Sequence, residues 1–174
     1  MSDAPTVDVA ASAPIVGLLE RVEQARQAAT IDWSLQLGEH EVVLRYKAVD
    51  FDTIEKITGK SQQQRGRVGV EQAARLIARA CIGIWVWVDG VLVAIDGIAD
   101  PEAASAVIDR DGTVHGTPLT FASDRIAETF GVATAADAVQ ALFPLELSIP
   151  EHARVILDFS SGKDEQTIRS ALGN

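Results

Sequence analysis

The stretch IDWSLQL, residues 31–37, alternates strictly between apolar and polar side chains. Successive side chains of a β-strand point to opposite faces, so this pattern is typical of a strand with one buried face. The predicted inward residues are Ile31, Trp33, Leu35 and Leu37. After a predicted turn at residues 38–41, VVLRYK continues the alternation with Val42, Leu44 and Tyr46. The two segments therefore predict an antiparallel hairpin.

A second hairpin is predicted by IWVWVDGVLVAIDG, residues 84–97, which is rich in β-branched and aromatic side chains. Its Asp89-Gly90 pair is the preferred chemistry of a two-residue turn. Residues 107–116, VIDRDGTVHG, predict a shorter strand pair. Trp85 and Trp87 share one face of the predicted strand, where core packing is the default and an exposed anchor is the alternative.

Two helices are predicted between these hairpins. The first is short, with Asp50 or Asp52 as its N-cap and Gly59 at its end. The second has a clear amphipathic pattern, in which Glu71 and the arginines that follow it lie opposite an apolar face. The apolar face comprises Ala73, Leu76, Ile77, Ala80, Cys81 and Ile84. Cys81 is thereby predicted to lie in the core.

The last third of the chain is predicted to be helical. Thr134-x-x-Asp137 and Ser148-x-x-Glu151 are capping signatures that each open a helix. Gly131 supplies the stop of an earlier helix.

Together these elements predict an α+β fold, with one or two antiparallel β-hairpins near the N-terminal half packed against a mainly helical C-terminal half. Residues 1–13 are small and polar, which predicts a disordered arm. Residues 30–160 are expected to form a single globular α+β domain, and residues 161–174 a tail with a short helix. Residues 14–29 predict an amphipathic helix, and its apolar stripe, a candidate partner-binding surface, consists of Ile15, Leu18, Leu19 and Val22.

Composition limits the classes of partner. The 174 residues carry a formal net charge of -10, with a pI near 4.7, which predicts repulsion from bare nucleic acid and from membrane surfaces. The single cysteine cannot form an internal disulfide, and no stretch combines the basic and apolar segments of a signal peptide. We therefore expect a cytoplasmic protein that binds neither nucleic acid nor membrane.

The stretch ITGKSQQQRGR, residues 57–67, contains a Gly-Lys-Ser triplet but does not fit a phosphate-binding loop. That motif needs a glycine where Ile54 stands, and it follows a strand, whereas this segment follows a predicted helix. A solvated connection is one interpretation, and contact with an acidic surface is the other. The candidate partner-binding cations are Lys56, Lys60, Arg65 and Arg67.

Catalytic and metal-binding patterns are weak. Counting a calcium loop from Asp109 places Gly112 two positions early, so the aspartates are better explained by hairpin turns. His40, His115 and His152 stand at no metal-ligand spacing, and Cys81 has no cysteine partner. We therefore expect no catalytic residue, cofactor or metal site, and no enzyme activity.

Several phrases of the sequence resemble one protein family. They are RYKAVDFDTIEKITGK, EQAARLIARACIGI, PLTFASDRIAETFG and AADAVQALFP, in that order. Between about Ile31 and Phe159 the chain is similar to the tail assembly chaperones of long-tailed bacteriophages, especially those of actinobacterial hosts. The resemblance implies a non-catalytic protein that transiently binds the tape measure protein and keeps it soluble in the host cytoplasm during tail assembly. It also implies a frameshifted longer form of the chain as a partner.

Other interpretations stay open at this point. A structural virion protein of the tail or neck, of the tail completion or connector type, would have a similar composition. An enzyme that uses the acidic loops is a further alternative, and a second copy of the chain is a further candidate partner.

Overall fold

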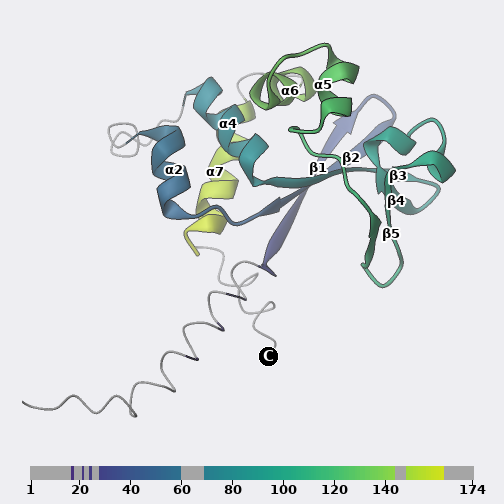
Figure 1. Cartoon of the computed structure of the whole chain (residues 1–174), viewed down its shortest axis with the longest axis horizontal. Coiled ribbons are helices and arrows are strands. Elements are labelled where there is room, and N and C mark those ends of the chain that lie inside the picture. Colours follow the sequence, from purple (N-terminus) through teal and green to yellow (C-terminus); the bar gives the residue numbers. More distant parts are fainter. Residues whose placement is uncertain are drawn as a thin grey trace, which may run out of the picture.

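The computed structural model describes residues 28–59, 69–143 and 148–162, together with positions 17, 21 and 24 (Figure 1). The predicted arm over residues 1–13 lies outside the described residues, as do most of the predicted helix over 14–29 and most of the predicted tail over 161–174.

The described strands form one six-stranded antiparallel sheet, and their spatial order follows the order of the chain. They are β1 (Thr30–Leu37), β2 (His40–Lys47), β3 (Cys81–Val88), β4 (Val91–Ala94), β5 (Ala106–Ile108) and β6 (Val114–Gly116). Both longer hairpins and the short third pair match the sequence predictions. The first turn is tighter than predicted, because His40 and Glu41 already pair with β1.

The turn between β3 and β4 consists of two residues whose backbone conformation suits a tight hairpin. Val88 pairs directly with Val91, so Asp89 and Gly90 alone make the connection. Both have positive φ, 50° for Asp89 and 78° for Gly90. This is the backbone of a type I′ turn, whose twist matches that of the flanking strands.

The described helices are mostly in the C-terminal half. They are α2 (Phe51–Thr58), α4 (Val70–Ala80), α5 (Asp124–Phe130), α6 (Ala135–Leu142) and α7 (Ser148–Ser160), with the 3-10 turns η2 (Ile95–Gly97) and η3 (Pro101–Ala103). Helix α4 is central to this layer, since it contacts α2, α6 and α7. In Figure 1, α2, α4 and α7 lie together on one side, and β3, β4 and β5 lie on the other. The protein thus has an α+β fold, as the sequence predicts.

Several predicted caps are present. Asp50 accepts a hydrogen bond from the Thr53 N–H at 2.8 Å and starts α2. Thr134 accepts from the Asp137 N–H at 3.1 Å and starts α6. Gly131 ends α5 in the left-handed conformation, with φ 64°. These caps satisfy backbone groups that the helices leave without an internal partner.

The predicted helix is longer than the observed one. Helix α4 ends at Ala80, and Cys81 begins β3 without any intervening loop. Cys81 and Ile84 are buried as predicted, but on a strand. The segment CIGIWVWV pairs with β2 and β4, and it is rich in β-branched and aromatic side chains. Both features favour a strand over a continued helix.

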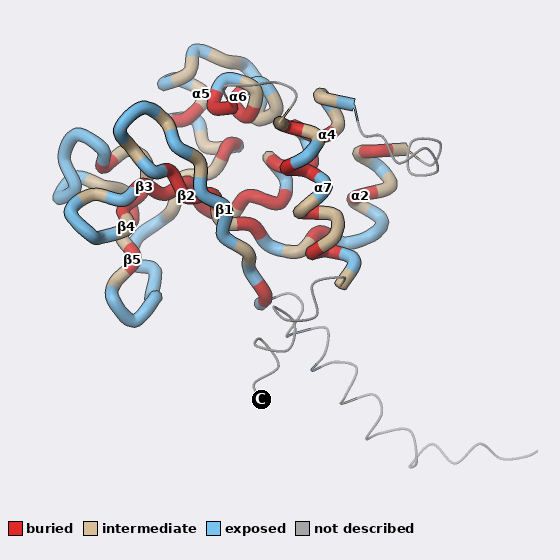
Figure 2. Tube along the Cα trace, turned by 180° about the vertical axis from the view of Figure 1, so that it is seen from behind, coloured by how far each residue is buried: buried red, intermediate tan, exposed pale blue. Residues whose placement is uncertain are grey.

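The sheet is buried on both faces near its centre, where β2 and β3 run mostly through buried residues (Figure 2). Val42, Leu44 and Tyr46 face the helices and belong to the main core, as predicted. A smaller cluster on the opposite face contains Val43, Trp85, Ala94, Ala106 and Ile108. Trp85 is therefore a core residue, whereas 42% of Trp87 is exposed.

None of the helices in the described part of the chain is long and apolar enough to span a membrane.

Candidate functional site

A groove of about 470 Å³ opens between the tip of the β1–β2 hairpin, η2 and α5. Most of its lining side chains are apolar, and we call it the apolar groove. The apolar lining residues are Leu37, Val42, Ile95, Ile98, Ala99, Leu119, Ile126, Phe130 and Leu142. The polar ones are His40, Asp96, Arg125 and Thr129.

The groove has a buried floor and a more accessible rim. Val42 and Ile126 are almost fully buried, while 37% of Ile98 is exposed. Ile126 and Phe130 lie one turn apart on α5, so both face the same side of that helix. The hairpin tip and the helix thus present apolar side chains toward a common space.

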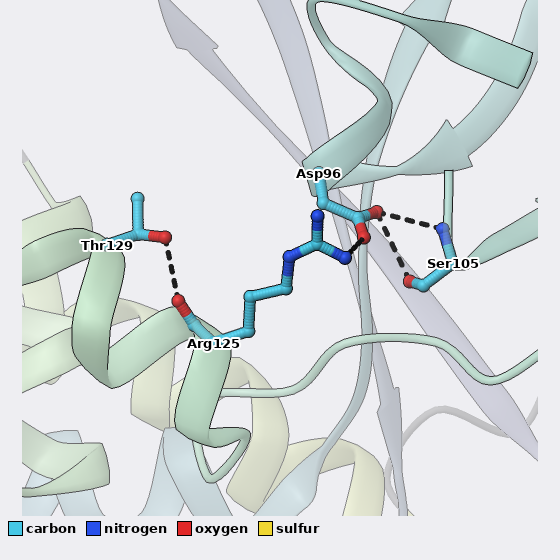
Figure 3. A network of polar contacts seen from close by, with 4 residues as sticks. All are labelled: Asp96, Ser105, Arg125 and Thr129. Carbon is cyan, nitrogen blue, oxygen red and sulfur yellow. Dashed lines mark hydrogen bonds and ion pairs between the residues drawn. The ribbon is translucent and has the colours of Figure 1, made fainter. Parts of the chain in front are cut away.

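A polar network ties two walls of the groove together (Figure 3). The Asp96 side chain is only 6% exposed, although it carries a carboxylate. It accepts hydrogen bonds from the backbone N–H of Ser105 at 3.1 Å and from the Ser105 hydroxyl at 3.2 Å. Its other oxygen accepts from Arg125 at 2.5 Å. A buried carboxylate is tolerated when several donors satisfy it, and here the donors come from separate segments.

The network also reaches along α5. The Thr129 hydroxyl donates to the Arg125 backbone carbonyl at 2.7 Å. The Arg125 side chain is 60% exposed, so it lies at the groove mouth, whereas Asp96 lies beneath it. The distance between η2 and α5 is therefore fixed by a contact at the entrance of the groove.

This arrangement is suited to binding an apolar group. A cavity of several hundred Å³ with apolar walls and a few polar groups at fixed positions is the usual form of a ligand or peptide site. The apolar walls favour aliphatic or aromatic side chains, and Arg125 and Thr129 offer polar contacts at the mouth.

Of the partner-binding residues predicted from the sequence, only Lys56 is among the described residues, and it does not line this groove. Lys56 is an exposed residue in the last turn of α2, away from the groove lining. The other predicted residues, Lys60, Arg65, Arg67, Ile15, Leu18, Leu19 and Val22, lie outside the described residues.

The groove itself was missed because its walls come from distant parts of the chain. Leu37 and Leu142 both line it, yet no local pattern connects them. The available sequence signal is the one-turn spacing of Ile126 and Phe130, which indicates only that α5 has an apolar side.

The single cysteine, Cys81, is buried, as the sequence predicts. Cys81 is 6% exposed, and burial raises the pKa of its thiol to about 12. Its Sγ donates to the Gly83 carbonyl at 3.6 Å. A thiol with a raised pKa is a poor nucleophile, because the reactive form is the thiolate.

His152 is buried in the core. Its Nε2 lies 2.6 Å from the Tyr46 hydroxyl, and its ring is edge-on to Trp33, Tyr46 and Phe143. Burial lowers the pKa of His152 to about 4. Burial also raises the pKa of Tyr46, so both groups are neutral, and the imidazole tautomer decides which of them donates the hydrogen bond.

The acidic hairpin loops have internal partners. Asp109 accepts from the backbone N–H groups of Asp111 at 3.0 Å and Thr113 at 2.9 Å, and it lies 2.9 Å from the His115 ring. The contact with His115 is the largest cause of the lowered pKa of Asp109. The described residues contain no group of three or more histidine, cysteine, aspartate or glutamate side chains placed to hold a metal ion.

Comparison of the chain with protein-family models, with curated proteins and with solved structures gives no match.

Proposed function

We propose that this protein is a non-catalytic chaperone of the bacteriophage tail assembly type, which transiently binds an apolar segment of a tape measure protein and keeps it soluble in the host cytoplasm. The observation that carries the proposal is the apolar groove with its fixed polar mouth. The resemblance of phrases such as LIARACIGI and PLTF to this family supports the choice of client.

The apolar groove fits the face of an amphipathic helix. Such helices bind by placing side chains from successive turns into an apolar channel. Each aliphatic or aromatic side chain that enters contributes roughly 1.5–3 kcal/mol. A few such side chains give binding that is specific and still reversible. Reversible binding is required because the client must later be released.

The net charge supports the same function. With 25 acidic and 15 basic residues, the protein carries the charge that keeps a complex with an apolar client in solution. The net charge therefore favours the solubility of the complex, and the apolar groove binds the client.

The test is co-expression with the tape measure protein. We expect the wild-type protein to raise the soluble fraction of the tape measure severalfold, and Ile98→Glu to abolish that effect, because it places a charge at the groove rim. Val114→Glu is the matched control, since Val114 is similarly exposed, 41% against 37%, and does not line the groove.

Two outcomes would count against the proposal. One is a tape measure that stays equally insoluble with and without the wild-type protein. The other is the presence of this protein at structural stoichiometry in purified virions, detected by peptide mass spectrometry, which would instead identify a tail or neck component.

A further inference from the structure

A second groove, of about 540 Å³, lies across α4 from the end of β2 to the start of α6. None of the described residues that line it also lines the apolar groove. Three of its lining residues are cationic, Lys47, Arg75 and Arg79, and we call it the cationic groove.

The three cations converge from two elements. Arg75 and Arg79 lie one turn apart on the exposed side of α4, and Lys47 is the last residue of β2. Arg75 forms an ion pair with Glu71 on the same helix. Lys47 and Arg79 form no ion pair with any residue that the structure describes.

This local charge differs from that of the rest of the molecule. Acidic residues outnumber basic ones by 25 to 15 in the whole sequence, whereas three cations line this groove. No acidic side chain is among the described residues that line the groove. The groove is therefore complementary to a negatively charged ligand.

The other described lining residues are mostly small or apolar, and they are Ala78, Cys81, Ile82, Thr120, Ala122, Ala135 and Ala136. Small residues allow a backbone to approach closely, and the aliphatic stems of arginine and lysine add apolar surface beside them. Such a lining fits a peptide backbone, and the guanidinium group of Arg79 can bind a carboxylate with two parallel hydrogen bonds. Arg75, which is paired with Glu71, adds positive charge beside it.

We propose that the cationic groove binds an acidic peptide segment of a partner protein, with glutamate or aspartate carboxylates on Lys47 and Arg79 and with Arg75 adding positive charge beside them. A long nucleic acid is a poorer occupant, because a protein of net charge -10 repels an extended polyanion beyond the groove. The inference goes beyond the proposed chaperone function, since it concerns a separate surface and a charged ligand.

The experiment measures fluorescence anisotropy of a labelled peptide in which glutamates alternate with alanines. The wild-type protein should bind this peptide, and the matched peptide with glutamines should bind at least tenfold more weakly. The double variant Lys47→Gln/Arg79→Gln should lose at least tenfold in affinity for the glutamate peptide, and added salt should weaken wild-type binding.

The control is Arg110→Gln/Arg154→Gln, which removes two exposed cations outside the groove. It should bind the glutamate peptide as the wild type does. Because all four substituted side chains are exposed, the melting temperatures of both double variants should stay close to that of the wild type.

The inference would be overturned by equal binding of the glutamine peptide, by an equal loss in the control variant, or by no binding of the glutamate peptide at millimolar concentration. Tighter binding of a single-stranded DNA oligonucleotide than of the glutamate peptide would also overturn it. None of these results bears on the solubility of the tape measure, so this inference and the proposed function can fail separately.

Discussion

At the residue scale, the contact between Tyr46 and His152 joins two positions 106 residues apart in the chain. It connects β2 of the sheet with α7 of the helical layer, and burial favours the neutral form of the imidazole. The sequence predicts that His152 lies near the start of a helix, but it does not predict this contact, because Tyr46 is distant in sequence.

The burial of His152 predicts a pH-dependent stability. The pKa of His152 is lowered from 6.5 to about 4 in the folded protein, so protonation favours the unfolded chain. Its contribution is fully present above pH 6.5 and is lost as the pH falls toward 4. The loss is about 3 kcal/mol, because each tenfold difference in proton affinity between the folded and unfolded chain corresponds to roughly 1.4 kcal/mol.

Urea unfolding measured between pH 7 and pH 4 checks this prediction, with His152→Phe as the comparison. The variant should have a flatter dependence on pH in that window, because its side chain does not titrate. A ring titration by NMR that places the pKa of His152 near 6.5 would contradict the prediction.

At the element scale, β3 has a tight contact that involves a glycine. An alanine Cβ at Gly83 would lie 2.3 Å from Nε1 of Trp85, a buried nitrogen without a hydrogen-bond partner among the described residues. The indole is almost fully buried, so it has little room to move. The absence of a side chain at position 83 is therefore what allows Trp85 to pack there.

Gly83→Ala should destabilise the protein by about 1–3 kcal/mol, since overpacking a core forces side chains or backbone to shift. The penalty should be smaller in a Trp85→Phe background, because phenylalanine lacks the indole atoms that the new methyl would meet. A double-mutant cycle of urea unfolding free energies measures this coupling. Equal penalties in both backgrounds would show that the indole is not the cause.

A second element-scale prediction concerns the network at the mouth of the apolar groove. Asp96→Ala removes the acceptor of both Ser105 donors, which should cost about 1–3 kcal/mol. Arg125→Ala should cost less, because the Asp96 carboxylate keeps both Ser105 donors and water can replace the largely exposed Arg125 side chain. Chemical unfolding of the two variants compares them, and a larger loss for Arg125→Ala would contradict this account of the network.

The hairpins and caps were predictable because their signals are local. Asp89-Gly90 specifies a two-residue turn by backbone conformation alone, and Thr134-x-x-Asp137 specifies a helix start by hydrogen-bond chemistry. The end of α4 was not predictable in the same way. Cys81 and Ile84 fit both a continuing helical stripe and a strand buried on both faces, and pairing with β2 decides between them.

At the scale of the whole molecule, the two grooves differ in the chemistry of their lining: one is mostly apolar, and the other contains three cations. The apolar groove lies at the tip of the first hairpin, and the cationic groove lies across α4. Neither could be predicted from the sequence, because each gathers side chains from several elements. What the sequence did indicate was the kind of chemistry: an acidic protein with apolar surface and no evident catalytic motif.

Hydrogen exchange of the protein alone and in complex with a tape measure segment tests the central claim most directly. The account predicts slower exchange in the complex over residues 95–99 and 124–130, which form two walls of the apolar groove. A complex that leaves both segments unchanged and slows exchange elsewhere would contradict the claim that this groove holds the client.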